Sequence, residues 1–133
     1  MLFLQLSLNP AVADFKHSKW IEMIHAEFPK AETMEIDNFS EVFLYQQILK
    51  WVVQSKESLV LHIESIDSEA TTGAMFRFLQ DIFQLKKPIC ITFHGTHAAV
   101  EKYIAAFGEF TAVKTEKEAV RYLKKLNRGG NSQ

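Results

Sequence analysis

The chain has 133 residues, about the length of one domain, and its 47% hydrophobic content with eleven Phe residues is ample for one core. Fifteen basic against sixteen acidic residues give a formal net charge of −1, which excludes a general electrostatic attraction to nucleic acid. The single cysteine, Cys90, excludes a disulfide-held scaffold and is interpreted as a buried, inert thiol.

The amino-terminal segment predicts a strand followed by a helix. Residues 2–8 alternate Leu with other side chains, and Asn9–Pro10 ends the run. This apolar stretch is too short to span a membrane and follows no basic segment, so we expect a soluble, cytoplasmic protein. Asp14 predicts the cap of a helix over residues 15–28, in which apolar side chains recur at three- and four-residue steps.

The next segment predicts a polar strand and an unusually apolar helix. Residues 32–37 have the polarity of a strand at a sheet edge. Asn38 followed by Glu41 resembles a capping box and predicts a helix from Asn38 to about Ser55. Its apolar residues extend over more than one face, so the helix is either buried on two sides or forms an interface with a partner.

The rest of the chain continues the alternation. Residues 58–63 form a near-continuous apolar strand, in which His62 is interpreted as a hydrogen-bonded core residue. The elements predicted after it are a helix over 69–85, a strand over 89–93, a helix over 98–107 that Gly108 ends, a strand over 110–113, and a last helix capped by Thr115 and Glu118. Its inward residues are expected to be Ala119, Val120, Leu123 and Leu126.

Five strand patterns that each precede a helix predict one α/β domain over residues 1–128, with a flexible tail over 129–133. We expect a three-layer α/β/α sandwich with a five-stranded, mainly parallel sheet in the flavodoxin-like order 2-1-3-4-5.

In such a sheet, ligands bind outside the carboxyl ends of the strands, near the point where the strand order reverses. The residues that follow strand ends are therefore our candidates for ligand binding or regulation: Asn9, Asp67, Ser68, His94, Thr96 and His97. Their ordinary structural roles would be helix capping, by Asp67 or Ser68 for one helix and by Thr96 for the next.

The sequence contains no motif that points to catalysis or to a cofactor. It has no glycine-rich phosphate loop, and the loop after the first strand has no glycine at all. His94 and His97 alone are too few ligands for a zinc site. Ser68, His94 and Asp67 lack the nucleophile elbow of a hydrolase triad. We therefore predict no catalytic residue, no metal and no cofactor, and we lean against an enzyme.

Three stretches resemble a known family. Residues 59–63 are similar to its central strand, Ile66-Asp67-Ser68 to the start of its phosphorylation loop, and residues 97–108 with the helix start at 115–119 to its carboxyl-terminal part. The family is that of STAS domains, the fold of anti-sigma-factor antagonists. The resemblance implies a STAS-like regulatory module in which Ser68 occupies the phosphoacceptor position.

Our leading hypothesis is a non-enzymatic regulatory module that binds another protein or a second copy of itself. Its contacts would be residues 65–72 with either the helix predicted from Glu69 or the helix predicted over 38–55. The alternative is a small ligand-binding protein or enzyme that holds a nucleotide or a phosphorylated metabolite in the strand-end crevice. A third hypothesis is a structural subunit that dimerises through the 38–55 helix. None of these involves nucleic acid or a membrane.

Overall fold

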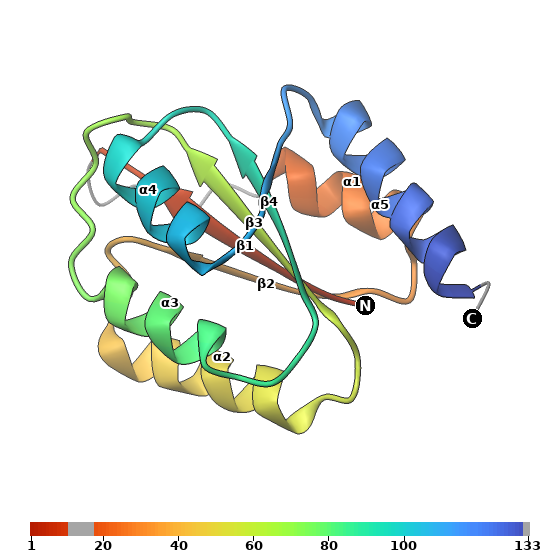
Figure 1. The fold of residues 1–133 in the computed structure, drawn as a ribbon, viewed down its shortest axis with the longest axis horizontal. Helices are drawn as coiled ribbons and strands as arrows, with labels where there is room; N and C mark the ends of the chain where they lie inside the picture. Colours follow the sequence, from red (N-terminus) through yellow and green to blue (C-terminus); the bar gives the residue numbers. More distant parts are fainter. Residues whose placement is uncertain (11–17, 132–133) are drawn as a thin grey trace.

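The computed structural model describes residues 1–10 and 18–131, and side chains as far as Leu126. In this part of the chain strands and helices alternate throughout (Figure 1): β1 (Leu2–Leu8), α1 (Lys19–Glu27), β2 (Glu32–Asp37), α2 (Val42–Gln54), β3 (Leu59–Ser65), α3 (Met75–Phe83), β4 (Ile89–His94), α4 (Ala98–Phe107), β5 (Thr111–Ala112) and α5 (Glu116–Asn131). The five strands form one parallel sheet in the order β2-β1-β3-β4-β5. The predicted flavodoxin-like strand order is confirmed.

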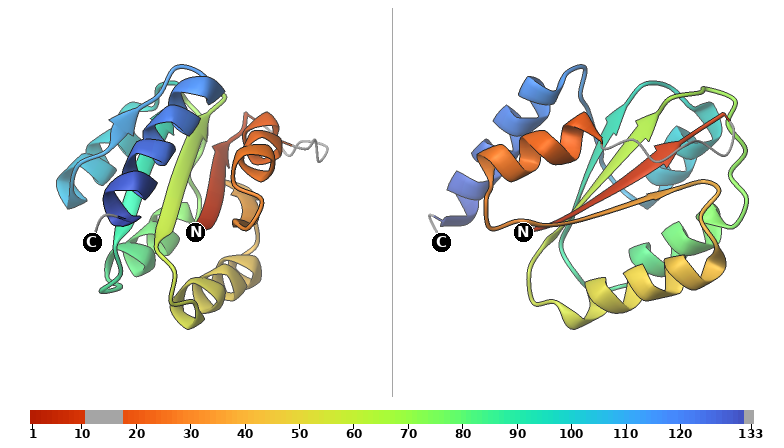
Figure 2. Two further views of the ribbon diagram at one scale, coloured as in Figure 1. Left: turned by 90° about the vertical axis from the view of Figure 1, so that its right-hand side faces the viewer. Right: turned by 180° about the vertical axis from the view of Figure 1, so that it is seen from behind.

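The sheet lies between two layers of helices. Figure 2 shows α1 and α5 on one face and α2, α3 and α4 on the other. Within the described residues, no helix is both long and apolar enough to cross a membrane.

Strand β1 explains why both faces need a helix layer, because all seven of its residues are buried. Side chains alternate between the two faces along a strand. Leu2, Leu4, Leu6 and Leu8 therefore join the larger core, beneath α2, α3 and α4. Phe3 belongs to the smaller core beneath α1 and α5.

The helices α1 and α2 both begin later than the sequence predicts. Ser18 caps α1, since its side chain accepts a hydrogen bond from the Trp20 N–H; the predicted cap Asp14 lies outside the described residues. The prediction that α2 starts at Asn38 is wrong, because the buried Asn38 amide bonds the backbone instead. Its Oδ1 accepts from Asn9 N at 2.8 Å and its Nδ2 donates to Thr71 O at 2.6 Å, which leaves Glu41 at the N-cap position.

The prediction that Asp67 or Ser68 caps α3 is also wrong. The helix starts at Met75, after Ala74 at the N-cap position, and ends at Phe83. Asp67 instead closes a local turn, in which its Oδ1 accepts from Glu69 N and its carbonyl oxygen accepts from Ala70 N. Gly73, with φ of 51°, interrupts any helix that would start earlier.

The carboxyl-terminal elements are predicted more closely. Helix α4 spans the expected residues, but its cap is His97 and not Thr96. Helix α5 starts as predicted, because Thr115 Oγ1 accepts from Glu118 N. It continues to Asn131, past the start of the predicted tail at residue 129. Leu126 is 44% exposed, contrary to the inward position expected for it.

The turn between β4 and α4 requires glycine at position 95. Gly95 has φ of 92°, and a Cβ atom there would lie 2.5 Å from the carbonyl oxygen of Ser65. Gly108 has extended backbone, and a Cβ atom there would meet nothing within 4 Å.

We therefore predict that Gly95→Ala lowers the free energy of unfolding by about 1–3 kcal/mol, through backbone strain and the contact with Ser65. Gly108→Ala is the matched control and should change stability by less than about 0.5 kcal/mol. Urea denaturation of the three proteins measures both effects. Equal stability of the two variants would contradict the assignment of strain to Gly95.

Candidate functional site

The carboxyl half of the sheet has two rows of polar side chains on the face covered by α1 and α5. The strand register places Gln5, His62 and Thr92 side by side in the first row. Two residues further along each strand, on the same face, it places Ser7, Glu64 and His94 side by side in the second row. These residues replace the apolar side chains that a buried face normally carries, so this face is a candidate functional site.

Among these polar residues, a first group of Gln5 and Glu64, together with Ser18, fixes the start of α1 over the sheet. Gln5 Nε2 donates to Glu64 Oε2 at 2.9 Å, and Gln5 Oε1 accepts from the Ser18 hydroxyl. Because Ser18 also caps α1, one buried amide connects β1, β3 and the first turn of that helix. Sequence reasoning passed over Gln5, although a polar residue in an otherwise apolar strand is a visible signal.

The second group surrounds the Trp20 ring. His62 is fully buried, lies 4.3 Å from that ring between centroids, and shares a 2.7 Å hydrogen bond through Nδ1 with Thr92 Oγ1. Burial, and secondarily the charge of His94, lower the pKa of His62 to about 3. The imidazole is therefore neutral at neutral pH, and the interpretation of His62 as a core residue is confirmed.

Of the six predicted site residues, His94 alone lies against this cluster. Its ring is 5.2 Å from that of Trp20, and it is half-buried at the end of β4. The Nδ1 of His94 and the Nε2 of His62 are both buried without a hydrogen-bond partner among the described residues. Trp20 thus packs against two imidazoles, and each has a buried ring nitrogen without a partner among the described residues.

Both ring nitrogens of His97 form hydrogen bonds to backbone groups. Its Nδ1 accepts from Val100 N at 3.3 Å, and its Nε2 donates to Ala70 O at 2.8 Å. Ala70 belongs to the core beneath α2, α3 and α4, whereas His94 packs on α1. The two histidines therefore face different layers, and among the described residues no group of three or more potential metal ligands occurs.

The remaining predicted residues also hold loops together or face solvent. Asn9 Nδ2 donates to Asp37 Oδ2 at 3.2 Å, and the carbonyl oxygen of Thr96 accepts from Ser65 Oγ at 2.6 Å. Asp67 occupies the turn described above, and Ser68 is exposed on the same loop. The six residues are thus distributed over several loops at the carboxyl end of the sheet.

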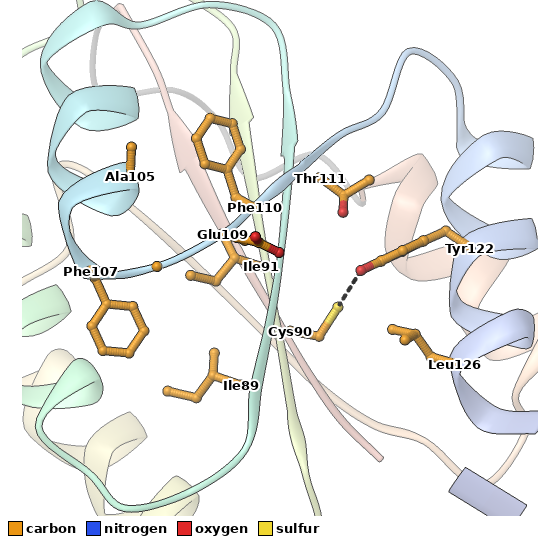
Figure 3. Close-up of a pocket in the computed structure, with 11 residues that line it drawn as sticks. Ile89, Cys90, Ile91, Ala105, Phe107, Glu109, Phe110, Thr111, Tyr122 and Leu126 are labelled. Carbon is orange, nitrogen blue, oxygen red and sulfur yellow. Dashed lines mark hydrogen bonds between the residues drawn. The ribbon is translucent and has the colours of Figure 1, made fainter. Parts of the chain in front are cut away.

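A hollow of about 810 Å³ lies elsewhere, along the outer edge of β4 between α4 and α5 (Figure 3). Strand β5 pairs with Thr92 and Phe93 of β4. The chain that leads into it from α4 crosses β4 at an angle in Figure 3. Residues lining the hollow are Ile89, Cys90, Ile91, Ala105, Phe107, Gly108, Glu109, Phe110, Thr111, Tyr122 and Leu126. Burial raises the pKa of the half-buried Cys90 thiol, which fits the inert role expected for it.

The outward face of α2 is a further candidate. Tyr45, Ile48 and Val52 anchor the helix to the sheet. Several large apolar side chains stay exposed on the other side of α2 and just before it: Phe39 37%, Val42 56%, Phe43 67%, Leu44 37% and Val53 56%. We call these five residues the α2 surface.

A scan against protein-family models, a search of curated proteins and a search of solved structures find no match for this chain.

The buried state of His62 generates a prediction about pH. The unfolded chain binds a proton at His62 below about pH 6.5 and the folded chain does not until about pH 3, so acid favours unfolding. Between pH 6.5 and 5 we expect His62 to lower the free energy of unfolding by up to about 1.4 kcal/mol per pH unit.

Urea denaturation of the wild type and of His62→Gln over this range tests the prediction. The wild type should lose stability more steeply than the variant as the pH falls, whatever the variant's stability at pH 7. Parallel pH profiles for the two proteins would mean that His62 titrates normally in the folded state.

Proposed function

We propose that this protein is a non-enzymatic regulatory interaction module that assembles with a second copy of itself through the α2 surface. The observation that carries the proposal is the exposure of Val42, Phe43 and Val53, each more than half accessible, on one helix. Exposed apolar side chains that gather on one element mark interaction sites more often than scattered ones do.

The composition of α2 favours a self-complementary contact. Its thirteen residues include one charged side chain, Lys50, and the other polar ones are glutamines and Tyr45. Two identical faces therefore meet with little like-charge repulsion, as a two-fold symmetric interface requires. Uncharged glutamines between apolar residues also suit the interior of such a contact better than carboxylates or lysines do.

The spacing of the exposed residues indicates how the two helices would meet. Val42 and Val53 of the α2 surface, with the exposed Gln46 and the partly buried Leu49 between them, follow steps of four, three and four residues along one seam of the helix. An antiparallel pair centred near Gln46 brings Lys50 of one copy close to Glu41 of the other. The helix dipoles of such a pair also oppose each other favourably.

The strand-end residues support the ligand-binding alternative less well. Both ring nitrogens of His97 are occupied, Asp67 holds a turn, and Asn9 is bonded to Asp37. The resemblance to STAS domains supports a regulatory role, and the exposed Ser68 is accessible for modification. Because α3 begins at Met75, however, a phosphate on Ser68 would lack the stabilisation of a helix amino terminus.

The proposal predicts a concentration-dependent dimer that charged residues on the α2 surface abolish. Phe43→Lys and Val53→Lys should each give a folded monomer. Both side chains are largely exposed in one copy, so the substitutions leave the fold intact and place a charge where the dimer would bury an apolar side chain. Light scattering after size-exclusion chromatography, with circular dichroism as the folding control, measures this. Leu126→Lys, an exposed position on α5, is the matched control and should stay dimeric.

A charge exchange tests the arrangement of the two helices. Glu41→Lys should weaken the dimer, and the double variant Glu41→Lys with Lys50→Glu should restore it, since opposite charges again face each other. A wild-type protein that stays monomeric at all concentrations tested would overturn the proposal.

A further inference from the structure

The outer edge of β4 is only half covered. On one side, Ile89, Cys90 and Ile91 pair with Leu59, Val60 and Leu61 of β3. On the other side, β5 lies opposite Thr92 and Phe93 alone, so the first three residues of β4 have no strand partner there. An uncovered strand edge is a template on which another extended chain can pair.

The backbone direction shows which groups face the hollow. Val113 N donates to the carbonyl oxygen of Phe93 at 2.8 Å, so the backbone of Phe93 is directed to the β5 side. Because backbone groups alternate in direction along a strand, those of Ile91 and Ile89 are directed to the same side. The parallel pairing of Thr92 with Thr111 directs the Thr111 N–H to the carbonyl oxygen of Ile91. The groups that border the hollow are therefore the N–H of Ile91 and the N–H and C=O of Ile89.

The walls of the hollow match the two faces of an added strand. Phe107 from α4 lies on the side of the Ile89 and Ile91 side chains, and Tyr122 and Leu126 from α5 lie on the side of Cys90 (Figure 3). A strand directs alternate side chains to opposite faces, so apolar residues on both faces of an incoming strand would each meet a wall.

We infer that this groove binds an extended segment of a partner protein, which adds to the sheet as a strand beside residues 89–91. The unpaired backbone edge favours a peptide in extended conformation over a helix or a lipid, since neither has free backbone groups to match it. Glu109 is the charged residue among the described side chains that line the groove, so a basic side chain next to the apolar ones is expected in the segment.

The inference uses no residue of the α2 surface, so the two can fail separately. The probe is a displayed library of random seven-residue peptides, selected on the full-length protein. We expect selected sequences with adjacent apolar residues and a basic residue, and we expect a synthetic copy of the best one to perturb the amide resonances of Ile89 and Ile91.

Two variants and one modified peptide make the test specific. Leu126→Lys should weaken binding of the synthetic peptide at least about tenfold, because it removes an apolar wall and repels the basic residue. Val53→Lys, on the distant α2 surface, should bind as the wild type does. N-methylation of alternate peptide residues should abolish binding by removing the backbone donors while the side chains stay.

Several outcomes would overturn the inference. They are a library that yields no binder, binding that survives N-methylation as an apolar ligand's would, and binding that Leu126→Lys leaves unchanged. A peptide that binds only the dimer and is lost with Val53→Lys would assign binding to the interface between copies instead.

Discussion

The burial of β1 and β3 on both faces is the constraint on which the rest of the structure depends. All seven residues of β1 and the first five of β3 are buried, so each face of the sheet must be covered by helices. One face is apolar along β1, β3 and β4, as far as Leu8, Ile63 and Phe93, and takes α2, α3 and α4. The other has the polar rows of Gln5, His62 and Glu64, which are satisfied largely by contacts among themselves and with α1.

The two interaction surfaces follow from this packing. Helix α2 packs one side against the sheet through its buried residues. The hydrogen bond from Trp51 Nε1 to Glu32 Oε2 holds the helix near the edge strand β2. Its remaining apolar residues are left outside. At the opposite edge, the two-residue β5 leaves β4 partly uncovered. Since the surfaces lie at opposite edges of the sheet, a dimer formed through α2 would keep both grooves accessible to a partner.

Most elements could be predicted from the sequence, because hydrophobic periodicity is a local property. The strand order was predicted from the habit of doubly wound α/β folds and not from any particular residue. The wrong start of α3 has a local cause, the turn closed by Asp67 and the positive φ of Gly73. Two other errors occur where a polar side chain has a distant partner. Asn38 bonds Asn9 and Thr71, His97 bonds Ala70, and in each case the predicted cap is displaced. The shortness of β5 was equally invisible, because Phe110 to Val113 has the composition of a strand whether or not it pairs. The sequence showed an excess of apolar residues in α2, but it did not show which of them face the sheet and which face outward.

A disulfide-trapping measurement tests the central claim most directly. In a Cys90→Ser background, Gln46→Cys should form a disulfide-linked dimer rapidly under mild oxidation, since the proposed antiparallel pair is centred near that residue. Gln54→Cys, exposed at the end of the same helix, should link far more slowly because its two copies would lie at opposite ends of the pair. Equal rates for the two variants, or no linkage of Gln46→Cys, would contradict assembly through α2.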